Sequence, residues 1–448
     1  MFKKFLCGLL SASMMAMLMT GCGSSPTPAA EPEAGEQSNA TTVEEASEPE
    51  QPAQADGEVT LELYHSWSPE TTRGEVLTSL VDEFNQLHEG KIHVNVETNP
   101  DFPAYQEKVK TMLSTGTAPD IFHYNYNPND LSYFESGLLM DFTPYMDAEW
   151  SERFESSDLE TLTYDGKLLS VPFESAGAVI WYNKDVFAEA GITEFPDTWD
   201  GLLEACKTLQ DAGYGGFSLF TGDDAWYSVN LITALWIANE GAATVNASTS
   251  FQTPGMINAL NTYKEFCKYS TSDVIGGNYS VAGANFSSKK TTMAIDGSWF
   301  TSYQDEAVIP SIGVAPMPAN GDGVATQGYL VTDAQTPWAA SAQTDPAKEA
   351  AIAEFMKFIT SEEATKTLTM EGSVVLSAKL ELSDTDLAGV TEQMAAYLKV
   401  NGDAPSRTTN LQRNLSTQAG AELPTLLESF LLDQITAEQF CEQLDELN

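Results

Sequence analysis

The chain has 448 residues, and its content of 42% hydrophobic and 10% aromatic residues is typical of a globular protein with room for two or more domains. Its formal net charge of -44 would repel a phosphate backbone, which excludes nucleic acid as a partner. Beyond residue 22 only Cys206, Cys267 and Cys441 remain, and this odd, widely spaced set argues against a disulfide framework or a zinc site.

Residues 1–22 have the pattern of an export signal. Lys3 and Lys4 form its basic start, and the apolar segment 5–19 is too short to span a bilayer comfortably. The signal ends in Leu-Met-Thr-Gly-Cys, which resembles a bacterial lipoprotein signal. That resemblance implies cleavage before Cys22 and a lipid on its thiol, whose acyl chains would hold the protein to a membrane. The alternative is a plain secretory peptide with an incidental cysteine.

Residues 23–58 are predicted to form a disordered acidic tether. They are rich in Pro, Ala, Ser, Gln and Glu, contain no Lys or Arg, and show no apolar periodicity. A random coil of this length would reach about 30 to 35 Å, and repulsion among its carboxylates would extend it further. The segment is therefore expected to link the lipid-bearing end to the folded body.

Strand and helix patterns alternate at the start of the folded body. Residues 59–67 alternate in polarity as a half-buried strand does, and an amphipathic helix follows to about residue 87. Second and third strands are predicted at 92–97 and 118–124, with a helix between them. This order indicates an open, mainly parallel sheet, in which ligands lie beyond the carboxyl ends of the strands. Those ends are occupied by Trp67, Tyr124 and Asn125.

The stretch around residues 171–187 is predicted to carry the chain from one lobe into another. It follows Asp165-Gly166, a turn signal between two runs that can be strands. Pro172 removes a ladder donor, so strand pairing should be interrupted there. Residues 178–182 then form a short apolar run, which is typical of a strand buried on both faces. The alternative interpretation is an ordinary strand–helix unit within a single domain.

Several motifs in this region and beyond it occur together in one family. The most specific is 286–299, where a basic turn leads into a strand that ends in Gly-Ser-Trp. The others are Tyr-Asp-Gly-Lys at 164–167, Tyr-Asn-Lys-Asp at 182–185, Pro-Asp-Thr-Trp at 196–199 and Ala-Pro-Met-Pro at 315–318. In this set the chain resembles the maltose-binding-protein-like, sugar-binding lipoproteins of ABC transporters, which are extracellular solute-binding proteins of family 1. The resemblance extends over nearly all of the chain after residue 58.

The resemblance implies an α/β fold of the periplasmic-binding-protein type II, with two α/β lobes, a multi-strand hinge and a ligand cleft between the lobes. The N-terminal lobe would comprise residues 59–174 and 328–378, and the C-terminal lobe residues 175–327 and 379–448. Besides the crossing at 172–178, the chain is expected to return near 326–328 and to cross a third time near 377–382.

The resemblance also implies a function. The protein would be the substrate-binding lipoprotein of an ABC importer, binding a carbohydrate, in particular an oligosaccharide, and delivering it to the transmembrane subunits of a permease. It would carry no catalytic residues, cofactor or metal. It would act as a monomer at the cell surface or in the periplasm, anchored to the membrane by the lipid on Cys22.

The chemistry of a sugar selects the candidate site residues. A pyranose has an apolar C–H face that suits a flat aromatic ring, and a rim of hydroxyls that suits carboxylates and amides. Removing about 100 Å² of apolar surface from water contributes about 2.5 kcal/mol per stacked sugar. Gly328 should allow a close approach of backbone. The stacking candidates are Trp67, Tyr124, Trp226, Trp299 and Tyr329, and the hydrogen-bonding candidates are Asn125, Glu174, Asp296 and Arg407.

Other classes of function stay open at this point. Acidic clefts also suit an amino sugar or a polyamine, which makes a cationic solute the second ligand class. The sequence contains none of the common nucleophile, zinc-protease or phosphate-loop motifs, and its four histidines give no support for a general base. Its 65 acidic residues leave open a surface glycoside hydrolase with a carboxylate pair. An adhesion protein without a closing cleft is the remaining alternative.

Overall fold

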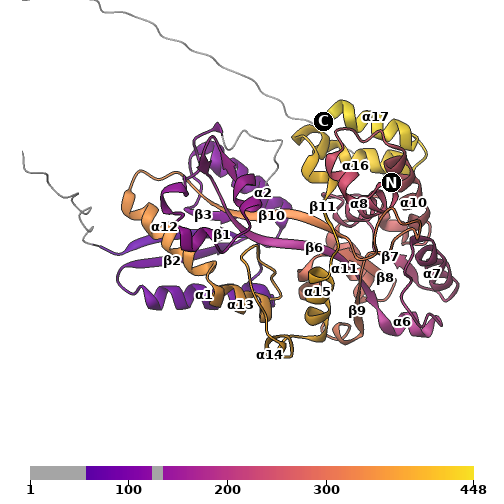
Figure 1. Cartoon of the computed structure of the whole chain (residues 1–448), viewed down its shortest axis with the longest axis horizontal. Coiled ribbons are helices and arrows are strands. Elements are labelled where there is room, and N and C mark those ends of the chain that lie inside the picture. The colour runs from indigo at the N-terminus through magenta and orange to yellow at the C-terminus, as the bar shows by residue number, and fades with distance from the viewer. Residues whose placement is uncertain (1–56, 124–134) are drawn as a thin grey trace, which may run out of the picture. The chain divides into compact units, whose positions relative to one another are not determined.

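The computed structural model describes residues 57–123 and 135–448 (Figure 1). Predictions for Cys22 and for Tyr124 and Asn125 lie outside the described residues, as does nearly all of the predicted tether. Within the described ranges, no helix combines the length and apolar character that are needed to cross a bilayer.

A nine-stranded sheet runs through the body in the order β2-β1-β3-β10-β6-β8-β7, with β11 paired to β10 and β9 paired to β6. The predicted, mainly parallel sheet is corrected to a mixed one, because β10 runs antiparallel to β3 and β6, and β6 runs antiparallel to β8 and β9. The strand bounds are β1 Val59–His65, β2 Ile92–Thr98, β3 Ile121–His123, β6 Val171–Asn183, β7 Gly215–Phe217, β8 Thr291–Asp296, β9 Ile312–Ala315, β10 Leu330–Ala340 and β11 Arg407–Thr409.

The first hydrophobic core lies around β1, β2 and β3, which pair in parallel as the alternation of their residues predicts. Helix α1 begins after Thr71, whose side chain accepts the Gly74 N–H, and buries Leu77, Leu80 and Phe84. These residues recur at helical spacing, so one face of the helix is apolar. The helices of this core are α1 Thr72–Leu87, α2 Phe102–Thr115, α4 Ala148–Ser151, α5 Ser156–Thr161, α12 Pro346–Ile359 and α13 Glu362–Met370.

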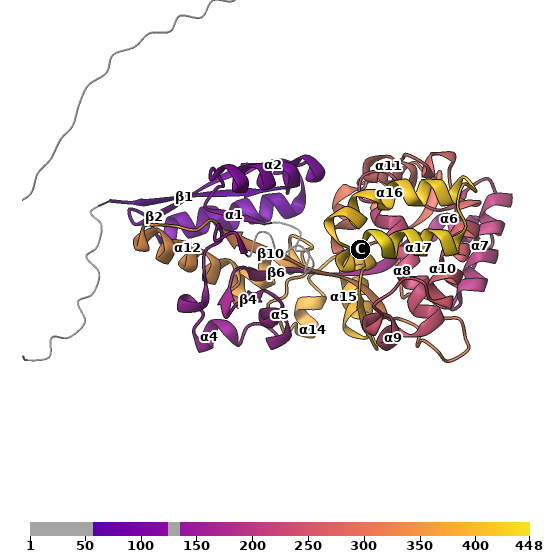
Figure 2. The ribbon, with the colours of Figure 1, turned by 90° about the horizontal axis from the view of Figure 1, so that it is seen from above.

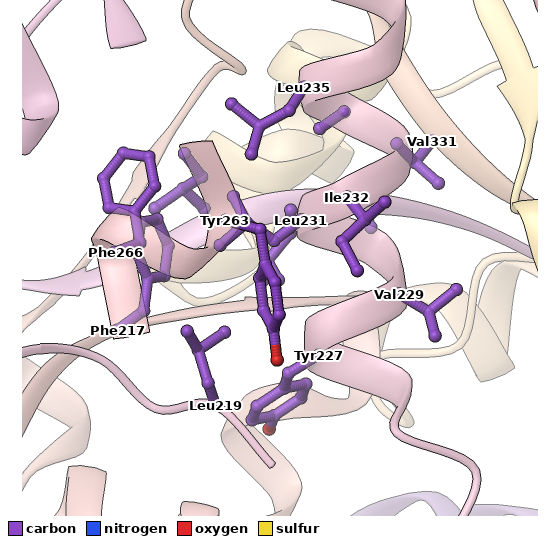
Figure 3. Packing of buried hydrophobic residues seen from close by; sticks show 14 of the residues in the cluster. Phe217, Leu219, Tyr227, Val229, Leu231, Ile232, Leu235, Tyr263, Phe266 and Val331 are labelled. Atoms are coloured by element: carbon purple, nitrogen blue, oxygen red, sulfur yellow. The ribbon is translucent and has the colours of Figure 1, made fainter. Parts of the chain in front are cut away.

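The second core surrounds α8, which is buried at every position from Trp226 to Ala238. A helix that is buried on all sides must be enclosed by other elements. Figure 3 shows Phe217, Leu219, Tyr263 and Phe266 on one side of it and Val331 on the other. The helices of this core are α6 Lys184–Glu189, α7 Trp199–Asp211, α8 Trp226–Glu240, α9 Ala242–Ala247, α10 Pro254–Cys267, α11 Tyr279–Ser287, α15 Glu392–Gly402, α16 Thr417–Leu431 and α17 Ala437–Leu447.

Two long strands, β6 and β10, join the two cores (Figures 1 and 2). Along β6, Phe173 belongs to the first core and Ala178 to the second. The pairing of β6 with β10 shifts register between Thr336 and Trp338, beside Pro172, as the missing ladder donor predicts. The return crossing therefore runs along β10 itself, a few residues later than 326–328. The lobe boundaries as predicted remain a prediction.

The third passage between the cores also lies later than 377–382. Helix α14 (Asp384–Leu387) stays with the first core, because Asp386 pairs with Lys366 of α13 at 2.7 Å. Helix α15 belongs to the second core, where Glu392 pairs with Lys184 at 2.8 Å. The chain thus crosses between these two helices, and it touches β6 earlier through a bridge between Glu174 and Leu376.

The Asp165-Gly166 turn has the predicted hairpin form. Both residues have positive φ, 48° and 76°, which suits a tight turn of the type that Asp-Gly favours. The strands that it joins are β4 (Thr163–Tyr164) and β5 (Lys167–Leu168), which pair antiparallel.

Candidate ligand-binding site

A cavity of about 860 Å³ lies between the two cores. Its volume falls within the range of about 300 to 1,000 Å³ that is common for small-molecule sites in proteins. The first core contributes residues that follow β1 and β2 and the last residue of β3, His123, all at the carboxyl ends of strands, as the sheet rule predicts. The second core contributes the starts of α8 and α11 and the turn after β8. The lining residues include Ser66, Trp67, Arg73, Asp101, His123, Glu174, Asp223, Asp224, Trp226, Tyr279, Trp299, Tyr303 and Arg413.

The wall from the second core is aromatic. Trp226 is the first residue of α8, and its ring centroid lies 6.2 Å from that of Trp299 at an interplanar angle of 36°. Tyr279 opens α11 and meets Tyr303 edge to face, with centroids 5.7 Å apart. Trp299 and Tyr279 are half-buried and Tyr303 is 44% exposed, so these rings offer faces to the cavity. Such a wall suits the apolar face of a sugar.

Asp296, the last residue of β8, stands behind this wall and does not line the cavity. Its carboxylate is fully buried and accepts hydrogen bonds from Trp226 Nε1 at 3.0 Å and Tyr279 Oη at 2.7 Å. Burial raises the pKa of Asp296 to about 6, although these hydrogen bonds and those from Gly297 and Tyr227 lower it. The predicted contact of Asp296 with a ligand is therefore corrected: its oxygens serve the protein's own side chains.

The wall from the first core is charged. The Nη2 of Arg73, in the first turn of α1, donates to both carboxylate oxygens of Glu174 on β6, at 2.8 and 2.9 Å. The guanidinium carbon lies 3.9 Å from the ring centroid of Trp67 and 5.9 Å from that of Trp299. Arg73 thus covers the face of Trp67, which is only 4% exposed. Trp67 lines the cavity as predicted, but its ring does not form an open platform.

Two buried histidines lie beside this wall. His123 lines the cavity and its Nε2 accepts the Ser66 N–H at 3.1 Å, while the Nδ1 of His65 accepts the Trp67 N–H at 3.1 Å. Burial lowers the pKa of His123 well below its usual value and, together with the charge of Arg73, lowers the pKa of His65 to about 3. Both rings are therefore neutral near pH 7, and nitrogens of such low pKa are weak bases.

The rim of the cavity is acidic. Asp223 and Asp224 precede α8, and Asp101 caps α2 by accepting the Ala104 N–H at 3.1 Å. Asp223 and Ala225 have positive φ, 50° and 55°, a conformation that costs energy for residues other than glycine and often occurs at functional sites. Burial raises the pKa of Asp224 to about 6, although the charge of Arg413, which also lines the cavity, lowers it.

Three predicted site residues lie away from the cavity. The ring of Tyr329 is fully buried in the second core, where its hydroxyl donates to the Ala234 carbonyl at 2.8 Å and accepts from Trp199 Nε1 at 3.0 Å. Arg407 donates to Asn401 Oδ1 at 2.9 Å on the surface. Gly328 has a positive φ of 87°, but it approaches Pro316 and Pro405 and not the cavity. These assignments are corrected, because each group is engaged elsewhere.

Sequence reasoning overlooked Arg73, Tyr279 and Tyr303. One signal was available for Arg73, since it lies in the first helical turn after the carboxyl end of β1, close to where parallel sheets bind ligands. Tyr279 follows Asn278, which caps α11, but nothing local shows that its ring turns toward a cavity. Among residues 57–123 and 135–448, no group of three His, Cys, Asp or Glu side chains is placed to hold a metal ion.

The family model for bacterial extracellular solute-binding proteins matches residues 68–366, which is more than half of the chain. The chain belongs to this family. The predicted family resemblance is thereby confirmed, and this solute-binding protein can be compared with individual members.

A protein of Brucella abortus described as a binding protein is 27% identical over 248 residues, which are 54% of this solute-binding protein and 59% of that relative. The multiple sugar-binding protein of Streptococcus mutans is 23% identical over 317 residues, covering 67% of this chain and 71% of the relative. A solved chitin oligosaccharide binding protein matches with a TM-score of 0.75 at 21% identity, covering 87% of this chain and 98% of that one. This likeness confirms the predicted fold, a two-lobed α/β binding protein of type II.

Proposed function

We propose that this solute-binding protein binds a carbohydrate in the cavity between its lobes and delivers it to the permease of an ABC importer. The observation that carries the proposal is the pairing of two unlike walls around about 860 Å³, with aromatic rings on one side and Arg73 and Glu174 on the other. A sugar ring presents the complementary pair of surfaces, an apolar face and a rim of hydroxyls. The S. mutans relative and the chitin oligosaccharide binding protein are sugar-binding by name, which supports the same ligand class.

The placement of the walls suggests how binding would close the protein. Trp226, Tyr279 and Trp299 belong to the second lobe, whereas Arg73 and His123 belong to the first. A ligand touches both walls only when the lobes come together, so it has more contacts with the closed form than with the open one. Binding therefore shifts the population toward closure. The closed form would be the one that docks on the permease.

The proposal also includes the location of the protein and its anchor in the membrane. The lipoprotein-like signal and the family's extracellular character support a place at the cell surface or in the periplasm, where a lipid on Cys22 would hold the protein, which we propose acts as a monomer. Mass spectrometry of the protein from its native membrane would test this. Two or more acyl chains on an amino-terminal Cys22 are expected, and an unmodified Cys22 in the mature protein would contradict the anchor.

A thermal-shift screen followed by calorimetry tests the ligand class. The chain from residue 23 onward would be titrated with chitotriose, maltotriose, xylotriose and raffinose, and separately with spermidine and a glucosamine trimer. A rise in melting temperature with at least one neutral sugar is expected, because a ligand that binds only the folded state stabilises it. Binding of none of the sugars, with binding of spermidine, would replace the proposal by the cationic one.

The cationic alternative rests on the acidic rim formed by Asp101, Asp223 and Asp224. A positively charged solute would be attracted there by a Coulomb interaction that weakens as salt rises. Affinity for the glucosamine trimer that falls steeply between 50 and 500 mM salt would favour this alternative. Affinity for chitotriose that is independent of salt would favour the neutral sugar.

We also infer that the protein does not turn its ligand over. A glycoside hydrolase needs one carboxyl to donate a proton and a second to act as base or nucleophile. Glu174 is ion-paired with Arg73, and Asp296 is enclosed by four donors, so neither is placed for those roles.

Of the rim carboxylates, Asp101 accepts the Ala104 N–H at 3.1 Å and Asp224 accepts the Trp226 N–H at 3.2 Å. Among the described residues that line the cavity, Asp223 is therefore left without a second free carboxylate to complete a catalytic pair. Release of shorter sugars from a bound oligosaccharide during overnight incubation would overturn this inference.

A further inference from the structure

The carboxylate of Asp296 is the junction of the aromatic wall. Its Oδ1 accepts Trp226 Nε1–H at 3.0 Å and the Gly297 N–H at 2.9 Å. Its Oδ2 accepts the hydroxyls of Tyr279 at 2.7 Å and Tyr227 at 2.9 Å. A carboxylate has about four acceptor positions, and all four are occupied by groups of the protein. No acceptor position remains for a ligand.

Two of these four donors belong to rings that face the cavity. Trp226 comes from the start of α8 and Tyr279 from the start of α11, so one buried carboxylate ties together the ends of two helices. Turning either ring away would break its bond to the Asp296 carboxylate, and a buried donor that loses its partner is unfavourable. Both rings are therefore held in one orientation before any ligand arrives.

The third ring depends on Asp296 through the next residue. A β-carbon on Gly297 would lie 2.6 Å from the ring of Trp299, so the indole packs directly on the backbone that Asp296 holds. Trp181 of β6 fixes the same backbone from the other side, because its Nε1 lies 3.1 Å from the carbonyl oxygens of both Asp296 and Gly297. Trp299 thus rests on a segment that is held on two sides.

We propose that Asp296 is a positioning residue for ligand binding: it orients the three rings of Trp226, Tyr279 and Trp299 without touching the ligand. This proposal rests on the proposed function, in which those rings stack against a sugar. Immobilising a free side chain on binding has an entropic cost that weakens affinity. Asp296 removes this cost in advance for three side chains at once, so affinity depends on a group outside the cavity.

The test is Asp296→Asn, which keeps the shape of the side chain but replaces one acceptor oxygen by a donor. Chitotriose or maltotriose, whichever the wild type binds, should bind about 10- to 100-fold more weakly, as expected for loss of buried hydrogen bonds that hold the site. The Nε1–H signal of Trp226 in protein labelled with ¹⁵N-tryptophan, assigned with Trp226→Phe, should move, since its acceptor has changed. Unchanged affinity together with an unchanged indole signal would overturn the proposal.

The matched control is Tyr263→Phe. Tyr263 is fully buried in the same core (Figure 3), and its hydroxyl donates to Ser228 Oγ at 3.0 Å. Neither Tyr263 nor Ser228 lines the cavity. This variant should lose stability yet keep the wild-type dissociation constant. Equal losses of affinity in both variants would show a general loosening of the lobe and would overturn the assignment to Asp296.

Two further readouts keep the outcome decisive. If Asp296→Asn does not fold, Gly297→Ala pushes a methyl group against the Trp299 ring and should weaken binding, and wild-type affinity in that variant would count against the proposal. If the wild type binds none of chitotriose, maltotriose, xylotriose and raffinose, the proposed ligand class fails. The Trp226 indole signal of ligand-free Asp296→Asn still decides whether Asp296 positions the ring.

Discussion

Arg73 lies close to Trp67, Trp299 and the carboxylate of Glu174, and these contacts explain why the wall from the first core is charged. Both Arg73 and Glu174 are buried, at 3% and 7% exposure, where a charge without its partner is strongly unfavourable. The guanidinium satisfies Glu174 and covers the ring of Trp67 at the same time. An arginine suits this position because its planar group can hydrogen-bond at its edge and stack on its face.

Arg73→Met should therefore lower the free energy of unfolding by about 3 to 5 kcal/mol, because it removes the opposite charge that faces the buried Glu174 carboxylate. The double variant Arg73→Met/Glu174→Gln should recover most of that loss, since no charge is then stranded. Urea unfolding of the wild type, the single variants and the double variant measures the coupling. Additive effects of the two substitutions would contradict a buried ion pair.

His65 predicts a pH dependence of stability. Its pKa is about 6.5 in an unfolded chain and is lowered to about 3 in the fold, by burial and then by the charge of Arg73. Below pH 6.5 the unfolded chain takes up a proton that the folded protein does not, so the contribution of His65 is fully present above pH 6.5 and is lost as the pH falls toward about 3.

The free energy of unfolding of the wild type should fall as the pH is lowered from 6.5 to 5. In His65→Asn this fall should be less steep, by up to about 1.4 kcal/mol per pH unit. An asparagine oxygen can still accept the Trp67 N–H in place of the ring nitrogen. The control is His93→Asn on β2, an exposed position that should follow the wild-type curve. Urea midpoints across this pH range give the comparison, and parallel curves for all three proteins would refute the prediction.

At the scale of elements, the position of a tryptophan in the fold decides whether it binds or supports. Trp199 opens α7 and is 2% exposed, with its Nε1 bonded to the buried Tyr329 hydroxyl. Trp299 lies in the short helical turn Ser298–Tyr303 after β8 and is half-buried at the cavity. The same residue type therefore belongs to the core in one element and to the binding wall in another.

Trp299→Ala should weaken sugar binding by about 2.5 kcal/mol, roughly 70-fold, while the melting temperature of the unliganded protein stays close to that of the wild type. Trp199→Ala should instead cost about 3 to 5 kcal/mol of stability, because it leaves a cavity in the core. Calorimetric titration and thermal unfolding of both variants measure the two effects. A large loss of stability with intact binding in Trp299→Ala would make Trp299 a core residue.

At the scale of the whole molecule, two cores joined by β6 and β10 predict a change in dimensions on binding. The radius of gyration from small-angle X-ray scattering should decrease when the sugar identified by the thermal-shift screen is added in excess. A solute from the same panel without a thermal shift should leave the radius unchanged. An unchanged radius with a bound sugar would favour a rigid binding protein over a closing one.

Several strands and turns, and the family, could be predicted from the sequence because the patterns that indicate them lie within short stretches of the chain. Alternation of polarity, helical spacing and turn residues act over a few positions, and the strand at 59–65, the Asp165-Gly166 hairpin and the irregular pairing at Pro172 follow from them. The motif set ending in Gly-Ser-Trp at 297–299 indicated the family, and with it the two-lobed fold. The chemistry of a sugar suggested Glu174, Trp226 and Trp299 as site residues, and these three line the cavity.

The amino-acid sequence by itself thus determined the order of the elements, the family and the presence of aromatic side chains near strand ends. Only the tertiary structure decided which of those side chains face the cavity, because their partners are distant in sequence. Asp296 meets Trp226 across 70 positions and Tyr329 meets Ala234 across 95, which turns the first into a support for the wall and the second into a core residue. Packing and hydrogen bonding between distant segments, not local pattern, set the direction of each ring.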